Sequence, residues 1–363
     1  MAGQYLTELY RIPTSGARAA EPFELSGETF LAIPQLAVDS PGTPAHMQAG
    51  DSETDLLVLR VTGDGAEEFQ RLRVPGGEDA EFFRIGDQVF LATASIRSGS
   101  GPYRFATEQQ IFTWDGASFV PFQSIPGYAG KQWRHIPIGH RHFLGLAQGV
   151  TLPGVPAADN LPSRIFEWDG QAFVPFQDIP SQWAYNWHPF TLGGEQFLAH
   201  ADNVVPSMLF RWDGSTFVEH QELADRSGRA FVDFEADGEH FLLVGRLHSE
   251  SELLRWDGER YVPHQKLAEL GGREFAVIRG EQGLYVVRVN FILGTPDAPK
   301  TALSSQLYRW EHGALAVVEE FPTTGGTDVA VFADAEGPLV AVCNSLSEDV
   351  RFAAHTTIYR FAG

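Results

Sequence analysis

Short apolar runs recur along the whole chain, each bounded by glycine, aspartate or proline. Four longer segments that contain such runs are near copies of one another: 111–123 (IFTWDGASFVPFQ), 165–177 (IFEWDGQAFVPFQ), 209–221 (LFRWDGSTFVEHQ) and 253–265 (LLRWDGERYVPHQ). Runs this short, bounded by turn residues and rich in aromatic side chains, predict β-strands rather than helices. A repeat made only of strands and turns predicts units that stack in a line or in a circle.

Two series of apolar strands can be followed through seven repeats. The first series lies at 30–32, 90–92, 143–145, 197–199, 241–243, 284–286 and 339–341, and the second, more aromatic series at 57–60, 111–114, 165–168, 209–212, 253–256, 307–310 and 358–361. Each repeat also holds an inner strand, with an apolar residue near its end at Phe23, Phe83, Ile136, Phe190, Phe234, Val277 or Phe332. An outer strand of the FVPFQ type completes the repeat, and four antiparallel strands are typical of a propeller blade. We predict an all-β fold in which residues 1–363 form a single seven-bladed β-propeller.

The two chain ends complement each other in this pattern. Residues 357–361 form the last aromatic strand with no FVPFQ-type strand after it, and residues 5–12 form a strand with no partner before it. Pairing the two would complete the seventh blade and remove two exposed strand edges. The alternative, an open solenoid, would leave both edges bare.

Asp-Gly pairs separate the aromatic strand from the outer strand at 115–116, 169–170, 213–214 and 257–258. Such pairs are typical of two-residue hairpin turns, whose central residues need positive φ angles. The turns on this side of each blade are short. The long insertions, at 34–54, 95–109, 148–163, 290–305 and 344–356, all fall at the opposite ends of the strands. Long connections on a rigid scaffold are common binding sites, so this long-loop face is expected to carry the function.

The segments IFTWDG (111–116) and FVPFQSIP (119–126), with their counterparts in other repeats, resemble the epilepsy-associated repeat, also called the EAR or EPTP repeat. The resemblance covers residues 5–361 and implies the propeller fold of the leucine-rich glioma-inactivated proteins. In those relatives the propeller serves protein–protein recognition, and some relatives hold calcium in the central channel. The resemblance therefore implies a binding role and makes calcium a candidate cofactor.

Composition narrows the classes of partner. The net charge of −21 disfavours binding to nucleic acid or to an anionic membrane, both of which need a basic surface. Cys343 is the only cysteine, so no disulfide forms within the chain. Residues 1–13 lack the pattern of a secretory signal, and no apolar run is long enough for a membrane-spanning helix. A soluble, acidic, cytoplasmic monomer is the resulting expectation.

Five of the eight tryptophans share one strand position in their repeats and are expected to pack between blades. The other three, Trp133, Trp183 and Trp187, do not follow the repeat and lie where two successive blades begin. Aromatic rings with polar neighbours suit a protein hot spot, a glycan or a small polar ligand at the mouth of the central channel. The simpler alternative is that these rings only wedge neighbouring blades apart. The candidate ligand-binding residues are Tyr128, Gln132, Trp133, Arg134, Trp183, Tyr185, Asn186, Trp187 and Arg273.

Counting back four residues from the apolar residue of each inner strand gives Ala19, Asp79, Gln132, Asn186, Ala230, Arg273 and Asp328. Repeats of the resembled family place aspartate here, so Asp79 and Asp328 are the candidate calcium ligands, because calcium takes six to eight oxygen ligands. A ring of hydrated polar residues, with Arg273 offsetting the acids, is the alternative.

Three functions remain open. The first is a recognition propeller that binds a protein, a glycan or a small polar ligand at the long-loop face. The second is an enzyme of lyase, cyclase or isomerase type, with His135, His188 and Arg134 as acid–base and charge-stabilising groups at the channel mouth. A lectin with one site per blade is the third, and the grouping of the unusual aromatic residues in only two blades counts against it.

Overall fold

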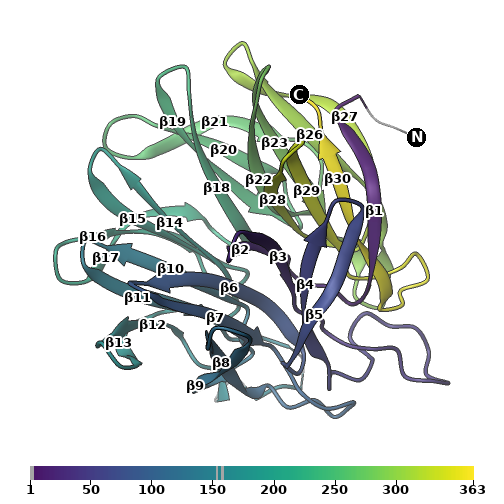
Figure 1. The fold of residues 1–363 in the computed structure, drawn as a ribbon. Coiled ribbons are helices and arrows are strands. Elements are labelled where there is room, and N and C mark those ends of the chain that lie inside the picture. Colours follow the sequence, from purple (N-terminus) through teal and green to yellow (C-terminus); the bar gives the residue numbers. More distant parts are fainter. Residues whose placement is uncertain (1–3, 153, 157–158) are drawn as a thin grey trace.

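The computed structural model describes residues 4–152, 154–156 and 159–363 as seven four-stranded antiparallel sheets arranged around one axis (Figure 1). The prediction of a seven-bladed propeller is confirmed. Blades 1 to 3 comprise β2 (Glu21–Leu25), β3 (Glu28–Ile33), β4 (Asp55–Thr62) and β5 (Gly65–Arg73); β6 (Gly77–Ile85), β7 (Gln88–Ser95), β8 (Ala106–Trp114) and β9 (Phe119–Tyr128); and β10 (Gln132–Ile138), β11 (Arg141–Ala147), β12 (Ser163–Trp168) and β13 (Phe173–Ile179).

Blades 4 to 6 have the same order of strands. They comprise β14 (Ala184–Leu192), β15 (Glu195–Asp202), β16 (Ser207–Trp212) and β17 (Phe217–Ala224); β18 (Gly228–Ala236), β19 (Glu239–Arg246), β20 (Ser251–Trp256) and β21 (Tyr261–Leu267); and β22 (Gly272–Gly280), β23 (Gly283–Asn290), β26 (Ala302–Glu311) and β27 (Ala314–Thr324). The insertion in blade 6 forms a small hairpin of its own, β24 (Leu293–Thr295) with β25 (Ala298–Lys300).

Blade 7 joins the two ends of the chain. It comprises β28 (Gly326–Asp334), β29 (Gly337–Asn344), β30 (Ala353–Phe361) and β1 (Leu6–Ser15), and β1 pairs with β30 from Leu6↔Phe361 to Ser15↔Ala353. Strands β1 and β30, from opposite ends of the chain, lie side by side in Figure 1. The predicted closure of the ring is confirmed.

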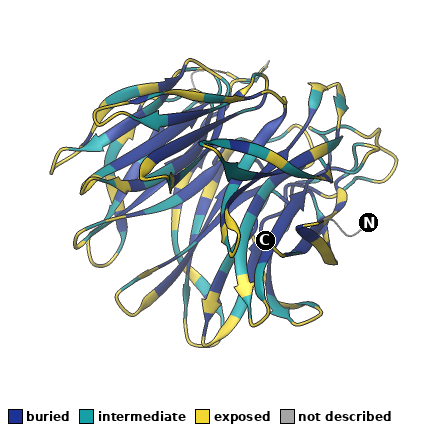
Figure 2. Ribbon diagram, turned by 90° about the horizontal axis from the view of Figure 1, so that it is seen from above, coloured by how far each residue is buried: buried dark blue, intermediate teal, exposed yellow. Residues whose placement is uncertain are grey.

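Aromatic side chains fill the spaces between neighbouring blades, and the buried residues follow the strands while the exposed ones gather at the turns (Figure 2). Trp114 of blade 2 lies 6.0 Å from Phe69 of blade 1, and Trp168 of blade 3 lies 5.9 Å from Phe122 of blade 2, measured between ring centroids. The repeated tryptophans are therefore packing residues, as predicted, because flat strands that diverge from an axis leave wedge-shaped gaps that large rings fill.

A glutamine of the outer strand ties one blade to the next at the five junctions from blade 1 to blade 6. Gln123 accepts a hydrogen bond from the backbone N–H of Phe173 at 2.9 Å and donates one to its carbonyl at 2.9 Å. The same reciprocal pair joins Gln70 to Phe119, Gln177 to Phe217, Gln221 to Tyr261 and Gln265 to Leu315. These bonds satisfy backbone groups that the outer strand of each blade would otherwise leave unpaired.

The Asp-Gly turns differ from the two-residue hairpins predicted for them. β8 ends at Trp114 and β9 begins at Phe119, so four residues connect the two strands. Asp115 accepts hydrogen bonds from the backbone N–H groups of Ala117 and Ser118, both at 2.8 Å, and Gly116 has a φ of 104°. The aspartate is therefore required as a side-chain acceptor within the loop, and the glycine for its positive φ.

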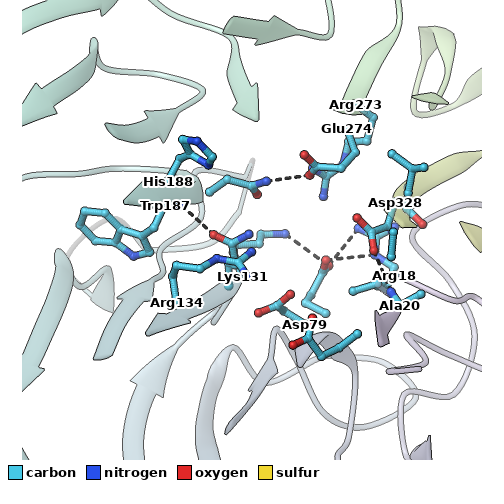
Figure 3. Close-up of a pocket in the computed structure, with 18 of the residues that line it drawn as sticks. Arg18, Ala20, Asp79, Lys131, Arg134, Trp187, His188, Arg273, Glu274 and Asp328 are labelled. Atoms are coloured by element: carbon cyan, nitrogen blue, oxygen red, sulfur yellow. Dashed lines mark hydrogen bonds and ion pairs between the residues drawn. The ribbon is translucent and has the colours of Figure 1, made fainter. Parts of the chain in front are cut away.

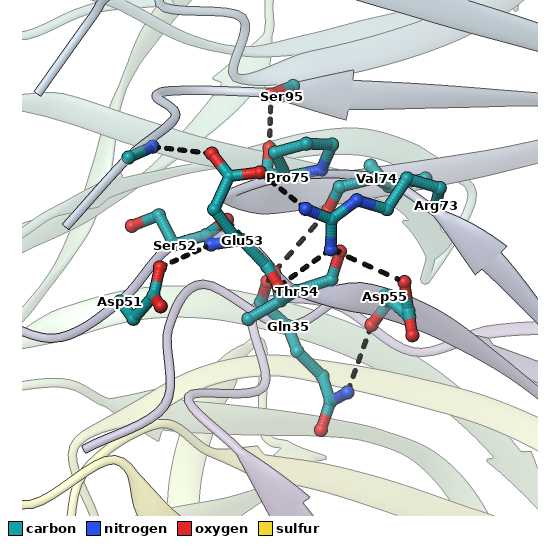
Figure 4. Close-up of polar contacts among 11 residues, drawn as sticks. Gln35, Asp51, Ser52, Glu53, Thr54, Asp55, Arg73, Val74, Pro75 and Ser95 are labelled. Atoms are coloured by element: carbon teal, nitrogen blue, oxygen red, sulfur yellow. Dashed lines mark hydrogen bonds and ion pairs between the residues drawn. The ribbon is translucent and has the colours of Figure 1, made fainter. Parts of the chain in front are cut away.

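The long connections pack onto the ends of the blades at the long-loop face. In residues 34–54, Thr54 donates a hydrogen bond to the carbonyl of Gln35 at 2.6 Å, and Arg73 donates one to the carbonyl of Glu53 at 2.7 Å (Figure 4). Arg97 holds the tip of the same loop through the carbonyls of Gln48 and Ala49. The expected position of the long insertions is correct for the parts described; residues 153, 157 and 158 of the 148–163 segment lie outside the described residues.

The described residues form no helix with the length and apolar character that crossing a membrane requires.

Candidate functional site

A cavity of about 390 Å³ occupies the central channel, where the inner strands of the blades begin (Figure 3). The inner strands enter from the long-loop face, so the beginnings of β2, β6, β10, β14, β18, β22 and β28 surround the same end of the channel. We call this end the channel mouth. Of the predicted site residues, Gln132, Arg134, Asn186, Trp187, His188, Arg273, Asp79 and Asp328 border the cavity.

Two successive positions of the inner strands form two tiers at the mouth. By strand position, the upper tier consists of Arg18, Glu78, Lys131, Tyr185, Arg229, Arg273 and Thr327, and the lower tier of Ala19, Asp79, Gln132, Asn186, Ala230, Glu274 and Asp328. All of them border the cavity except Tyr185, Arg229 and Ala230. Consecutive strand residues normally face opposite sides, but the pairing of the inner strands shifts register here, for example between Gly77 and Asp79 and between Gly272 and Glu274. The extra residue of such a bulge allows neighbouring residues to line the same cavity.

The register predicted for blade 6 is wrong by one residue. The inner strand β22 pairs Gly280 with Gly283 at its hairpin, which makes Ile278, only 2% exposed, the equivalent of Phe83 and Phe234. Val277 is half-buried instead. Counting back from Ile278 places Glu274 in the lower tier and moves Arg273 to the upper tier.

Carboxylate and amide side chains of the lower tier bind the backbone of the next blade. Asp79 accepts a hydrogen bond from the N–H of Trp133 at 2.8 Å, Gln132 from that of Trp187 at 2.6 Å, and Asp328 from that of Ala20 at 2.7 Å. The inner strand is the free edge of each sheet, so its N–H groups need partners outside the sheet. The lower tier supplies them and thereby connects neighbouring blades.

Most acids around the cavity hold their protons more tightly than usual; Glu78 is the exception, because Arg18 and Lys131 outweigh its burial and lower its pKa to about 2. Burial raises the pKa of Asp79 well above its ordinary value, and burial together with Asp328 raises the pKa of Glu274 to about 8. Burial and the nearby Glu81 also raise the pKa of Glu21. Arg134 opposes this effect, because its guanidinium lies among the carboxyls and forms an ion pair with Glu81 at 2.5 Å.

This donor set does not fit the calcium site that the resemblance implies. Asp79 and Asp328 each commit an oxygen to a backbone N–H, and the cations Arg134 and Arg273 border the same cavity. Among the residues with described positions, no three His, Cys, Asp or Glu side chains are grouped to hold a metal ion. Calcium needs six to eight oxygen ligands, and this arrangement offers too few.

The two inner-strand tryptophans, Trp133 and Trp187, pack between neighbouring blades. The side chain of Trp133 is fully buried and donates from Nε1 to the carbonyl of Thr93 at 3.1 Å, and Trp187 is 1% exposed. The indole of Trp187 lies 4.1 Å from the ring of His200 and covers Gly145, where a Cβ would stand 3.2 Å from Nε1. Both rings fill the gap between blades, as the simpler alternative expected. Trp133 does not line the cavity, whereas Trp187 borders it, and its contact with a ligand stays a prediction.

Tyr128 and Trp183 also lie outside the cavity lining. Tyr128 is buried in a small apolar cluster with Ala129 and Val150, and Trp183 is half-buried beside the same cluster. Trp183 reaches toward the mouth only through its stacking with Tyr185, at 6.4 Å between ring centroids.

Cations surround Tyr185 in the upper tier. The charged groups of Arg229, Arg273 and Lys131 lie 3.9, 5.1 and 5.2 Å from the centroid of its ring. Burial alone would raise the pKa of the Tyr185 hydroxyl, but these cations outweigh burial and lower it. Lys131 and Arg229 were not among the predicted site residues, because the upper tier mixes cations with glutamate, tyrosine and threonine and shows no shared chemistry in the sequence.

Only one of the two predicted histidines faces the cavity. His135 stacks on Phe83 at 4.7 Å, contacts His142, and does not line the channel; burial lowers its pKa to about 4. His188 borders the cavity and shares a hydrogen bond with Asp233 at 2.7 Å, and the other oxygen of Asp233 lies 3.0 Å from His240. Burial would raise the pKa of Asp233, but its bonds to the two histidines outweigh burial and lower it.

Comparisons with known proteins agree with this architecture. The EPTP domain model matches residues 118–169, 172–213 and 216–257. The human thrombospondin-type laminin G domain and EAR repeat-containing protein is 31% identical over 173 residues, which cover 47% of this chain and 24% of that protein. Mouse leucine-rich repeat LGI family member 3 is 24% identical over 225 residues, or 53% of this chain and 39% of that protein. The chain thus spans well under half the length of these curated relatives.

Two solved structures share the fold at 10% sequence identity. They are the β-propeller domain of Myceliophteria thermophila Cps50 (Swd1), with a TM-score of 0.60 over 98% of this chain and all of that one, and BBS1N in complex with ARL6, with a TM-score of 0.60 over 99% and 97%. At this identity the likeness concerns the fold alone. The family match and the curated relatives confirm the EAR/EPTP resemblance of the repeats.

Proposed function

We propose that this EAR/EPTP-repeat propeller is a recognition module that binds a protein, a glycan or a small polar ligand at the channel mouth. The observation that carries the proposal is the cavity of about 390 Å³, which is bordered by charged and polar side chains of both tiers. Ligand sites in proteins are concave, have volumes of this order and contain a few polar groups that converge on one space.

The surroundings of the mouth support the proposal. The connections of blades 5, 6, 7 and 1 pack together through Leu247, Phe291, Leu346 and Leu36, which forms a rigid rim on the long-loop face. Hydrogen bonds from backbone N–H groups to side chains of the neighbouring blade fix the inner strands that line the channel. A rigid wall reduces the conformational entropy that binding costs. The opposite face has only short turns.

The experiment that tests the proposal is capture of partners from the source organism under native conditions, read by quantitative mass spectrometry of proteins and of small molecules. Asn186→Ala, at the mouth, should lose the captured species. Arg260→Gln, in an exposed turn of the opposite face, should retain it. Capture that survives Asn186→Ala and disappears with Arg260→Gln would refute a binding role for the mouth. A monomeric state and a cytoplasmic location are part of the proposal, and light scattering and cell fractionation test them.

An enzyme of lyase, cyclase or isomerase type is the second candidate, and one observation favours it. His188 borders the cavity, Asp233 orients it, and Asp233 also bonds to His240, which shares a hydrogen bond with the hydroxyl of Tyr261 at 2.8 Å. A histidine oriented by a carboxylate is a common general acid or base. Turnover of a captured small molecule should then be lost in His188→Ala and kept in His135→Ala. Equal turnover in both variants would exclude this role.

A further inference from the structure

The upper tier contains more buried cations than it has anions to pair with them. Arg18 donates two hydrogen bonds to the carboxylate of Glu78, at 3.0 and 2.9 Å, and Lys131 lies 3.4 Å from the same carboxylate. The single carboxylate of Glu78 is therefore the ion-pair partner of two cations. Within the described part of the chain, Arg229 and Arg273 have no acidic oxygen within 4.0 Å, although they are only 4% and 7% exposed.

Three of the cations gather around one aromatic ring. Arg229, Arg273 and Lys131 all lie within 5.2 Å of the centroid of the Tyr185 ring. An aromatic ring attracts a cation by about 0.5–2 kcal/mol. Burial of a charge without a counter-ion costs several kcal/mol, and like charges at this spacing add repulsion. The ring alone does not compensate Arg229 and Arg273, so the upper tier by itself lacks negative charge. Asp79, Glu274 and Asp328 of the lower tier border the same cavity, but burial raises their pKa values and so favours their neutral forms.

Arg273 has a hydrogen-bond donor that no group of the protein uses. Its Nη1 atom is buried and has no partner among the described residues, and Arg273 borders the cavity (Figure 3). Buried donors are nearly always satisfied, so an unpaired one indicates a group that the chain itself does not supply. A guanidinium matches carboxylate and phosphate oxygens, which accept two parallel hydrogen bonds from it.

We propose that Lys131, Arg229 and Arg273 form an anion site at the channel mouth, which holds the carboxylate or phosphate group of a small hydroxylated molecule. This inference rests on the proposed function, since it names the chemistry that the mouth recognises. The lower tier supports the hydroxylated part: Gln132 and Asn186, which follow Lys131 and Tyr185 in their strands, border the cavity and can exchange hydrogen bonds with hydroxyl groups. The chain carries a net charge of −21, so this local excess of positive charge acts at short range rather than by attracting anions from a distance.

Isothermal titration calorimetry of the full chain tests the inference with three probes: D-glucuronate, inorganic phosphate and neutral D-glucose. At least one of the two anions should bind, glucose should bind at least tenfold more weakly, and added salt should weaken the binding. Binding of glucuronate alone would identify a carboxylate as the recognised group, and binding of phosphate alone would identify a phosphate. No binding of either anion up to about 10 mM would overturn the inference.

Variants locate the site. Arg273→Gln should weaken anion binding at least tenfold, whereas Arg260→Gln, which removes the same charge from an exposed turn of the opposite face, should leave it unchanged. If Arg273→Gln does not fold, as judged by circular dichroism, Lys131→Met takes its place. Equal anion affinity in the wild-type chain and in the folded mouth variant would contradict the inference. The partner-capture experiment is independent: if Asn186→Ala loses its captured species while neither anion binds, the recognition role stands and the anion site does not.

Discussion

The backbone N–H of Trp133 donates a hydrogen bond to Oδ2 of Asp79 at 2.8 Å, across the boundary between blades 2 and 3. The same relationship joins Gln132 to Trp187 and Asp328 to Ala20. The side chains that seemed most suited to a metal ion in the sequence are therefore acceptors for the free edges of the inner strands. Their position in the channel is explained by the connection between blades.

Replacement of Asp79 tests this structural role. Asp79→Ala removes the acceptor of a buried N–H, so the free energy of unfolding should fall by about 1–3 kcal/mol. Asp79→Asn keeps a carbonyl oxygen at the same place and should lose much less, because burial already disfavours the charged form of this acid. Urea denaturation measures both. Equal losses in the two variants would contradict the role of Asp79 as an acceptor.

Trp187 is predicted to stabilise the ring rather than to bind a ligand. Its side chain is 1% exposed and packs against Gly145 and His200, so Trp187→Ala should lower the free energy of unfolding by about 3–5 kcal/mol. Trp183→Ala is the matched control, because the half-buried ring of Trp183 packs less completely, and its loss should be smaller. Thermal and urea unfolding compare the two. A Trp187→Ala protein that keeps wild-type stability but no longer captures its partner would show that this ring acts in ligand binding instead.

Glu274 makes the stability of the fold depend on pH. Its pKa is about 8 in the folded chain, compared with an ordinary value of 4.5, because of burial first and of Asp328 second. Between these two values the folded chain keeps a proton that the unfolded chain has released. The stabilisation is therefore complete below about pH 4.5 and is lost as the pH rises toward 8, with a slope of at most about 1.4 kcal/mol per pH unit.

Urea midpoints between pH 5 and 8 measure this dependence. Glu274→Gln should reduce the slope, to which Asp79 and Glu21 also contribute, and make the variant more stable than the wild type at pH 8. Glu24→Gln changes an exposed acid and should leave the slope as it is. A slope that Glu274→Gln does not change would show that another group is responsible.

The sequence was sufficient for the fold because every blade repeats the same four apolar strands. A strand that was missed or misplaced in one repeat would stand out by comparison with the other repeats. The chain ends could be paired for the same reason, since only a strand of the type at 5–12 was missing from the last blade. The turn geometry was not visible, because Asp-Gly is compatible both with a two-residue hairpin and with the longer loop that Asp115 closes through its side chain.

The site was harder to predict because it depends on register. Val277 and Ile278 are both apolar, and the choice between them moved Arg273 and Glu274 by one position in the channel. The bulges at the start of the inner strands broke the alternation that would have directed Trp187 to the gap between blades and Tyr185 to the mouth. Arg18, Lys131 and Arg229 come from different blades, and only the closed ring brings them together.

Anomalous diffraction is the most direct measurement of the central claim, which is that the channel mouth recognises its ligand through buried cations that outnumber the acids paired with them. Crystals of the full chain would be soaked in selenate, an oxyanion that resembles phosphate, and recorded at the selenium edge. The account predicts an anomalous peak among Lys131, Arg229 and Arg273, within hydrogen-bonding distance of Nη1 of Arg273, that is absent from Arg273→Gln crystals. An empty mouth in the wild-type crystals, or a peak of unchanged height in Arg273→Gln, would contradict it.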